Sequence, residues 1–376
     1  MANTFITPSL IARDAAISLF NRLLVGNMVS REKEGLFTAS KIGDSVGVTL
    51  PPVVTDADEF TGSTAATDQE ETEVDLTLEK HFYKRVDITT KQKSLELSDF
   101  TRLITVPNIQ GIQESIDKFF LRNMQVFRKN IAGTIGNRPS TVAHVAAGMK
   151  VLNDNKLGKR GRLALIDTTV ATSLIQIDEF TSGDFGQDGP QALREGQIAS
   201  RLGLDFFQDA NLGAFSRSAA ANDIAGTVLV DGTVAAGGST LHIDGITSTT
   251  GTIYAGCAFT IAGDSTRYVV RKDATIASNE VDLAITPVLA AQATDGAAIA
   301  FEAAGFSNIM FHPNAVAGAI VAPEPLAIGS AVESFGGVSI RVSMDSSIVS
   351  LADSIVYDVF VACRVIQPDG GALFCG

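Results

Sequence analysis

Residues 107–135 carry the hydrophobic pattern around which the rest of the chain is interpreted. Apolar side chains recur there at steps of three and four residues: Ile109, Ile112, Ile116, Phe120, Met124, Phe127, Ile131 and Ile135. This spacing places them on one stripe of an α-helix. The other side is polar, and is either solvated or faces another charged surface: Gln113, Glu114, Asp117, Lys118, Arg122, Arg128 and Lys129. With stop signals at Gly136 and Pro139, we predict a helix over 108–135, roughly 40 Å long. It serves either as a strut under a sheet or as an ordinary core helix.

Residues 8–28 predict a shorter amphipathic helix. Its apolar positions are Leu10, Ile11, Ile17, Phe20, Leu23 and Leu24. Two interpretations stay open at this point. The helix packs on its own domain, or it reaches a neighbouring subunit, as terminal segments ahead of a loose stretch can do.

Residues 41–92 predict one long hairpin. The return strand alternates apolar and polar residues at Val74, Leu76 and Leu78, which is typical of a half-buried strand. The middle of the hairpin, residues 55–73, contains seven acidic residues and no basic one: Asp56, Asp58, Glu59, Asp68, Glu70, Glu71 and Glu73. These lack the spacing of a calcium loop, so we favour a solvated tip over a cation site. An arm of this kind cannot bury both faces against its own chain, and we expect it to lie on something else.

The chain then changes from helical to mixed patterns. The expected elements are a short helix or turn at 94–105, a helix at 139–157, a strand at 162–167, a helix at 168–176, a loop at 181–190, and strand or turn pieces at 194–212 joined through Gly203. Buried strands that alternate with helices indicate an α/β unit.

Residues 223–303 differ in composition from everything before them. Thr, Ser, Val, Ile, Ala and Gly dominate, and turn signals recur every 8–12 residues. This pattern predicts a small antiparallel β-barrel or sandwich. Mixed structure resumes afterwards: a strand at 307–313, a helix or irregular link at 314–326, and strands at 337–347 and 354–368. The β-rich block therefore reads as an insertion within the α/β unit.

Composition narrows the class of protein. The chain has 376 residues, 45% of them hydrophobic, which is enough for two or three structural units. Its formal net charge of −13 makes tight binding to a phosphate backbone a poor prediction, although a local basic face could meet nucleic acid. The start of the sequence lacks the pattern of a signal peptide, and no run of about 18 apolar residues predicts a membrane span.

Candidate chemistry is sparse. The histidines, His81, His144, His242 and His312, show no paired metal spacing, and no nucleophile-elbow, phosphate-loop or dinucleotide motif occurs. Cys257, Cys363 and Cys375 are widely spaced, which predicts reduced thiols rather than a disulfide framework or a zinc site. Asp205 and Asp209 lie four residues apart with nothing to aim them at a common cleft. We predict no enzyme, no cofactor and no metal.

The order of these elements resembles a known family. The segments that carry the resemblance are NTFITPSLIARDA at 3–15, GRLALIDTTVATSL at 161–174, LREGQIASRLGLDFFQDANL at 193–212, and the closing run of strand, helix and strand at 308–374. Together they resemble the major capsid proteins of tailed bacteriophages, which have the HK97-like fold. The block at 223–303 departs from the minimal fold, and it resembles the β-barrel domain inserted in coat proteins of some short-tailed phages.

The resemblance implies an α+β fold with named parts. These are an N-terminal arm at 1–40, an E-loop at 41–92, a P-domain at 93–160 with its spine helix at 108–135, an A-domain at 161–222 and 304–376 whose closing strands partly return to the P-domain, and an inserted antiparallel β-barrel at 223–303. The resemblance also implies that the E-loop and arm contact neighbouring subunits. The residues expected in those contacts are Leu10, Phe20, Val48, Leu50, Glu70, Glu71, Leu76 and Leu78.

The function implied is a container rather than a catalyst. Copies of the chain would form the hexamers and pentamers of an icosahedral shell, assembled in the host cytoplasm, that becomes the virion capsid. Scaffolding and portal proteins, and a decoration protein, are the implied partners, with no membrane. The shell would enclose double-stranded DNA without reading its sequence. Lys118, Arg122, Arg128 and Lys129 are a candidate interior basic face. The alternatives are an encapsulin-type nanocompartment shell, a carbohydrate-binding or adhesive β-protein, and an enzyme.

Overall fold

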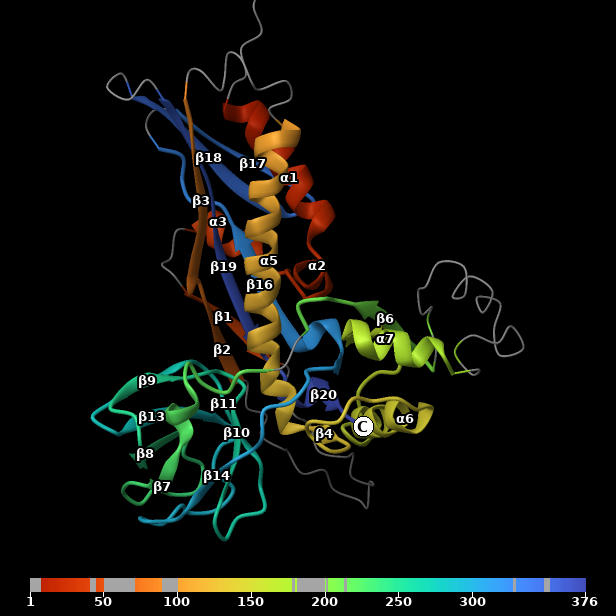
Figure 1. Cartoon of the computed structure of the whole chain (residues 1–376), viewed down its shortest axis with the longest axis vertical. Helices are drawn as coiled ribbons and strands as arrows, with labels where there is room; N and C mark the ends of the chain where they lie inside the picture. Colours follow the sequence, from red (N-terminus) through yellow and green to blue (C-terminus); the bar gives the residue numbers. More distant parts are fainter. Residues whose placement is uncertain are drawn as a thin grey trace, which may run out of the picture. The chain divides into compact units, whose positions relative to one another are not determined.

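The computed structural model describes residues 8–40, 45–50, 72–89, 101–177, 180, 200, 202–212, 215–326, 329–347 and 352–376. The chain divides into two compact units (Figure 1). Unit 1 comprises residues 1–23, 31–115 and 317–366, and unit 2 comprises residues 24–30, 116–316 and 367–376. The boundary at residues 115–116 falls inside helix α5, which therefore contributes residues to both units.

The N-terminal helix α1 (Pro8–Arg22) packs on strands β17 and β18 of unit 1. Its buried residues are Ile11, Ala12, Ala15, Ala16 and Leu19. The predicted apolar stripe is therefore partly wrong, because Leu10 is 53% exposed. Small alanine side chains let the helix approach the sheet closely, so they form the buried face in place of some larger residues. The helix ends at Arg22, and a separate short helix, α2 (Val25–Met28), begins in unit 2. Helix α3 (Glu34–Ser40) follows in unit 1.

The unit 1 sheet is built mainly from the end of the chain. Strands β16 (Val316–Val321), β19 (Ala352–Val365), β18 (Val338–Ser347) and β17 (Ser330–Phe335) are neighbours in this order, and β3 (Lys80–Thr89) pairs antiparallel with β19. The turn between β17 and β18 uses Gly336 and Gly337, whose φ angles of 58° and 83° suit glycine. The strands predicted at 337–347 and 354–368 are confirmed.

Strand β16 corrects the helix or irregular link predicted at 314–326. All six of its residues are buried. A short apolar run that is covered on both faces shows neither helical nor alternating periodicity, so the pattern could not identify it. A short 3₁₀ turn, η5 (Pro313–Ala315), precedes β16, and another, η6 (Pro368–Gly370), follows β19.

The predicted hairpin is present at its base. Strand β1 (Ser45–Leu50) pairs antiparallel with β2 (Thr72–Thr77), with Val46 opposite Leu76 and Val48 opposite Val74. The middle of the hairpin, residues 51–71, lies outside the described residues. The return strand is divided, because β2 pairs with β1 whereas β3 pairs with β19.

Helix α5 (Val106–Asn123) confirms the amphipathic pattern but is shorter than the predicted 108–135. A π-helical turn, η1 (Thr101–Thr105), precedes it. The chain tightens after it into a 3₁₀ helix, η2 (Met124–Lys129), and then enters strand β4 (Ile131–Ala132). Every residue from Met124 to Arg128 is buried. Protein surrounds this segment, so the one-sided burial that stabilises a long amphipathic helix is lost there.

Unit 2 contains a second sheet, in the order β4-β20-β15-β5-β6. Its strands β5 (Arg162–Ile166) and β6 (Leu204–Gln208) are parallel, whereas β15 (Ile309–Phe311) runs antiparallel to β5 and to β20 (Gly371–Phe374). Helices α6 (Val142–Asp154) and α7 (Thr168–Ile175) share its core, with Val145, Leu174 and Phe374 among the buried residues. These elements confirm the predictions for 139–176.

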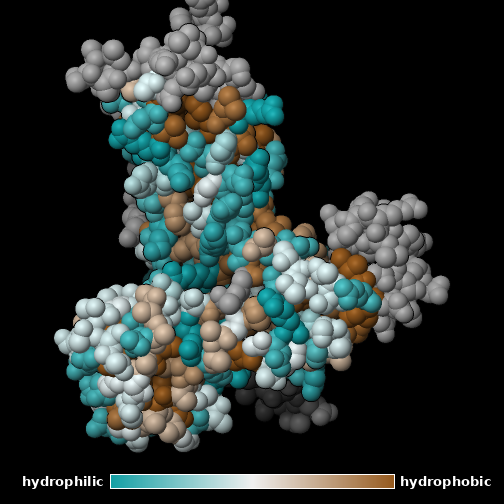
Figure 2. All heavy atoms as spheres, viewed as in Figure 1, coloured by the Kyte–Doolittle hydropathy of each residue, from teal (hydrophilic) through white to brown (hydrophobic). Residues whose placement is uncertain are grey.

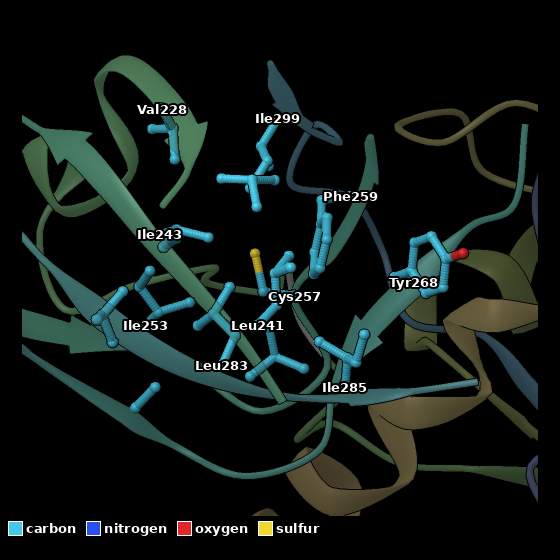
Figure 3. Close-up of a cluster of buried hydrophobic side chains, with 14 of the residues drawn as sticks. Val228, Leu241, Ile243, Ile253, Cys257, Phe259, Tyr268, Leu283, Ile285 and Ile299 are labelled. Carbon is cyan, nitrogen blue, oxygen red and sulfur yellow. The ribbon is translucent and has the colours of Figure 1, made fainter. Parts of the chain in front are cut away.

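The block at 223–303 forms an antiparallel β-domain between β6 and β15. After a 3₁₀ turn, η4 (Ala221–Ile224), its strands are β7 (Gly226–Val230), β8 (Thr240–Ile246), β9 (Thr250–Ile253), β10 (Ala258–Ile261), β11 (Tyr268–Val270), β12 (Ala274–Ala277), β13 (Val281–Thr286) and β14 (Ile299–Phe301). The sheet order is β14-β10-β11-β13-β8-β7, and β9 pairs with β12. An isolated bridge between Leu229 and Ala298 brings the two edges of the sheet nearly together. Figure 3 shows the apolar core of this domain, in which the side chains of Cys257 and Phe259 lie among residues from several strands.

Candidate functional site

The outer edge of the unit 1 sheet is strongly polar. In the described part of the chain, β3 pairs with β19 alone. Lys80, Lys84, Arg85 and Asp87 lie along this strand, and Tyr83 is 67% exposed. Charged side chains on an edge strand oppose open-ended pairing with strands of other molecules. The charges on β3 therefore disfavour pairing with a strand of another molecule. Tyr83 is the large apolar side chain exposed on this edge.

Asp358 joins three strands of this sheet. Its buried carboxylate accepts hydrogen bonds from Arg341 Nε at 3.0 Å and from Arg341 Nη2. His81 Nε2 lies 2.9 Å from the same carboxylate. Arg341 also donates from Nη1 to the carbonyl of Glu324 at 2.6 Å. Because these groups engage one another, their arrangement favours a structural role over acid–base chemistry.

The base of the hairpin buries one face in its own unit, and the expectation that such an arm cannot bury both faces against its own chain stays a prediction. Val48 and Leu76 belong to a core cluster with Ala317, Ala319 and Ala362. Leu78 packs against the same cluster and Leu50 is half-buried. Val48 and Leu76 therefore have almost no exposed area left for a neighbour, whereas Leu50 and Leu78 keep part of theirs. Glu70 and Glu71 lie outside the described residues.

Leu10 and Phe20 lie on α1 in different environments. Leu10 is among the most exposed large apolar residues, as is Leu103 in the adjoining turn η1. Figure 2 shows hydrophobic surface at the end of unit 1 where α1 begins. Phe20 is half-buried, with its ring centroid 5.4 Å from that of Phe335 in an edge-to-face pair. Leu10 is thus available for a further contact, whereas Phe20 is largely used within the unit.

The four basic residues predicted on one face are not equivalent. Lys118 is exposed. Arg122 forms an ion pair with Asp273 at 2.6 Å, and Lys129 forms one with Asp369 at 2.7 Å. Arg128 is 1% exposed, which is the clearest correction to a basic face. Its guanidinium donates to Gln125 Oε1 and to the carbonyl of Gly305, both at 3.2 Å. Burial lowers the pKa of Arg128 to about 10, so the side chain is still charged at neutral pH.

Histidine and cysteine side chains do not assemble into a reactive centre. Among the residues that the structure describes, no group of His, Cys, Asp and Glu side chains is arranged to hold a metal ion. All three cysteines are free and buried. Burial raises the pKa of the Cys257 thiol to about 12, which makes it a packing residue rather than a nucleophile. None of the helices in the described ranges has the length and apolar character needed to cross a membrane.

Two contacts near the N-terminus were missed in the sequence. Glu34 Oε1 accepts the backbone N–H of Ile320 at 3.3 Å, and Arg31 Nη2 donates to the carbonyl of Gly336 at 2.9 Å. Arg31 Nη1 also lies 3.8 Å from Glu34 Oε2. The pair thus holds the start of α3 to strand β16 and to the turn between β17 and β18. The spacing of Arg31 and Glu34 at three residues was the one available signal, and such pairs are common on solvated helices.

Unit 2 contains a cavity among its described residues. Its volume is about 300 Å³, and it is lined by Lys118, Arg122, Asn211, Phe215 and Tyr254, among others. The lining comes from α5, from the segments before and after the inserted domain, and from that domain itself. The cavity thus lies where the inserted domain meets the rest of unit 2.

The central part of the sequence matches a protein family. Residues 102–228 match the model of a family described as phage capsid protein. This stretch runs from η1 through α5, α6 and the parallel strands to the first strand of the inserted domain. The resemblance to phage capsid proteins drawn from the sequence is confirmed by this match. No curated protein matches the chain.

A solved structure of low sequence identity shares the fold. A structure described as Mycobacterium phage Che8 aligns with a TM-score of 0.52 and 16% identity, over 94% of this chain and 90% of that chain. This chain has the fold of a phage capsid protein. The capsid of Cyanophage P-SCSP1u aligns at a TM-score of 0.47 with 14% identity, over 88% of this chain and 83% of that one. The capsid of Ralstonia phage GP4 aligns at 0.49 with 9% identity, over 92% and 86%.

The capsid fold gives the observed elements a common frame. The mixed α and β architecture predicted from the resemblance is confirmed. Helix α5, at the start of the family match, is the element from which the sequence interpretation began.

Proposed function

We propose that this chain is the major capsid protein of a tailed bacteriophage, and that its copies assemble into the icosahedral shell around a double-stranded DNA genome. The observation that carries the proposal is the phage capsid family match over residues 102–228. The described contacts support it, because they stabilise two units and present no reactive centre. The function is mechanical, and we propose no catalytic role and no cofactor.

Assembly would use the parts that a subunit does not cover itself. Val48 and Leu76 anchor the hairpin base in their own core, so the intersubunit part of the E-loop would lie beyond that base, toward Glu70 and Glu71. Leu10 offers exposed apolar area at the start of the arm. Many such contacts, each weak, would add up through multivalency to a stable container. Closure follows if each contact joins different surfaces of successive subunits around a symmetry axis.

The inserted domain would be a β-barrel. Its support is the near-closure of the sheet, where Val230 donates its backbone N–H to the carbonyl of Ala297 at 2.9 Å next to the Leu229–Ala298 bridge. Closure removes exposed strand edges, which suits a domain on the outside of an assembly.

The charge of the chain suits enclosure of DNA without tight binding. A net charge of −13 repels phosphate. Of the four basic residues proposed for the interior, Arg128 is buried and two others are paired, which leaves Lys118 as the exposed member. The family resemblance supports assembly of this chain into hexamers and pentamers. It also supports scaffolding, portal and decoration proteins as partners.

Electron microscopy of the purified chain tests the proposal. Expression alone and with a scaffolding protein encoded nearby should yield closed shells of uniform size. Mass spectrometry of native particles should find DNA together with portal and tail proteins. A packaged enzyme in their place would identify a nanocompartment, and a chain that stays monomeric under all conditions would contradict both.

A further inference from the structure

One arginine joins helix α5 to two separate points of the inserted domain. The Cζ atom of Arg122 lies 3.9 Å from the centroid of the Tyr254 ring, which follows β9. Arg122 Nη2 lies 2.6 Å from Asp273 Oδ1, just before β12. Asp273 Oδ1 also accepts the backbone N–H of Ala255 at 3.0 Å. The guanidinium thus fits between a ring face and a carboxylate that is already fixed by its own domain.

The backbone of the inserted domain also touches the segment after α5. Gly256 has a φ of +88°, and a Cβ atom there would lie 2.1 Å from the Cβ of Gln125. Only glycine permits so close an approach. In Figure 3 the ribbon of the α5–η2 segment passes beside β11, which contacts η2. One face of the domain is therefore seated on the end of the helix.

The entry and exit of the inserted domain are tied together. Phe215 donates its backbone N–H to the carbonyl of Gly305 at 2.9 Å. Arg128 bonds that same carbonyl, and its Cζ lies 4.3 Å from the centroid of the Phe215 ring. These contacts fix where the domain is rooted. A root alone leaves the domain free to rotate about it, so the orientation depends on contacts further out.

Packing between the helix and the domain is interrupted. The cavity of about 300 Å³ lies beside Arg122 and extends to Tyr254 and Phe215. Apolar side chains therefore do not seal this side of the junction, and fewer dispersion contacts hold the two parts together there. The ion pair and ring contact of Arg122 span the gap that packing leaves.

We propose that Arg122 is a positioning residue that locks the inserted domain to helix α5, so that the two move as one body. The lock consists of an ion pair and a ring contact, and salt weakens these two interactions to different degrees. The side chains of Arg122 and Asp273 are 34% and 36% exposed, so salt weakens their ion pair. The contact with Tyr254 depends less on salt, because the guanidinium also packs its flat face on the ring. Breaking both parts would leave the domain folded and held by its root at Phe215 and Gly305 and by the approach of Gly256 to Gln125, which permits a wider range of orientations.

Spin-label distances in the full chain, kept unassembled, test the lock. The native cysteines are buried, so labels can be placed selectively with Lys150→Cys on α6 and Thr233→Cys in the inserted domain, both of them exposed positions. The unmodified lock should give one narrow distance distribution. Arg122→Ala should broaden it, and Asp273→Asn should do so in part, because the amide oxygen can still accept from Ala255.

Amide exchange separates undocking from unfolding. In Arg122→Ala, exchange should become about tenfold faster in residues 211–217 and 303–308, as expected from the loss of one favourable contact, while β8 and β13 keep their protection. Lys129→Ala is the matched control, because it removes an ion pair of similar length from the adjoining turn, one whose partner, Asp369, is outside the inserted domain.

The outcomes decide the proposal. A narrow distribution in Arg122→Ala would overturn it, as would equal broadening in Lys129→Ala. If Arg122→Ala does not fold, then Arg122→Lys and Tyr254→Leu decide, since both should broaden the distribution if the flat ring contact positions the domain. Since these measurements need no shell, they can fail while the proposed capsid function stands.

Discussion

The carboxylate of Asp117 accepts the backbone N–H of Val25 at 3.1 Å, within unit 2. The same side chain also accepts from Gly26 at 3.3 Å and from Leu24 at 3.4 Å, and it is fully buried. A carboxylate of α5 thus satisfies the backbone donors at the start of α2, which no side chain of that helix caps. The segment after α1 is anchored by one residue that is distant in sequence.

Replacing Asp117 should therefore destabilise unit 2. We expect Asp117→Ala to lower the free energy of unfolding by about 3 kcal/mol, because several buried N–H groups lose a charged acceptor. Asp117→Asn should cost less, since one oxygen remains to accept. Glu114→Ala, at a half-buried position one turn earlier in the same helix, should stay within about 0.5 kcal/mol. Denaturant unfolding measures all three, and equal effects at positions 114 and 117 would contradict the anchor.

Glu34 should make the stability of unit 1 depend on pH. Burial raises its pKa from 4.5 to about 7, and the nearby Arg31 and the Ile320 N–H offset this only in part. The pKa in the folded state exceeds that in the unfolded state, so the stabilising contribution is full below pH 4.5 and is lost as the pH rises through 7. The loss relative to Glu34→Gln should reach about 3 kcal/mol above pH 8.

Unfolding of wild type and Glu34→Gln across this pH range measures the difference. Glu32→Gln provides the control, because Glu32 is an exposed neighbour. A wild-type curve parallel to that of Glu34→Gln would show that Glu34 does not take up a proton on folding.

Arg128 should be the most sensitive basic residue of the chain's central segment. Arg128→Ala removes the donors to Gln125 and Gly305 and leaves a void under Phe215, which should cost about 3 kcal/mol. Arg128→Lys should cost less but not nothing, because an ammonium lacks the flat fork that meets both acceptors. Lys129→Ala, which breaks a partly exposed pair, should cost less than about 1 kcal/mol. Thermal unfolding ranks the three, and a neutral Arg128→Ala would refute this assignment.

His242 should titrate above its ordinary range. The hydrogen bond between its Nδ1 and Asp282 Oδ1, 2.7 Å apart, is the largest cause and raises the pKa. Burial opposes it, and the charges of Asp282, Asp231 and Glu280 add to the rise. The contribution to stability is present below pH 6.5 and is lost as the pH rises through the raised pKa. It should stay below about 1 kcal/mol, because the side chains are exposed.

Histidine NMR signals measure this titration directly. Asp282→Asn should lower the pKa of His242 more than Glu280→Gln does, since Glu280 Oε2 lies 3.7 Å away. Salt should shrink both shifts. An unchanged pKa in Asp282→Asn would exclude the hydrogen bond as the cause.

Periodicity predicted where the helices and strands lie better than it predicted which of their polar side chains are buried. The stripe of Ile109, Ile112, Ile116 and Phe120 is buried as expected. Asp117 and Arg128 were placed on the solvated side by the same rule, and both are buried. A helical pattern records one covered face, but it carries no information on what a distant segment brings to the other face. This limit also explains why the helix was extended past Asn123, where protein surrounds the chain.

The hairpin shows the same limit, because its buried face was predicted but the strand that covers that face was not. Its alternation correctly marked Leu76 as inward-facing. The partner that covers it, β16, has no strand pattern, so periodicity does not predict a core there. The pattern therefore missed a core contact within the same chain, whereas the expected contact with another molecule stays a prediction.

Strand β20 has a consequence for synthesis. It lies between β4 and β15 in a sheet whose other strands are all synthesised before it. A ribosome needs about ten to thirty seconds to advance from β6 to β20 at ordinary elongation rates. During that interval the nascent polypeptide carries apolar strands whose neighbour has not been translated, and chaperones have their best opportunity to intervene.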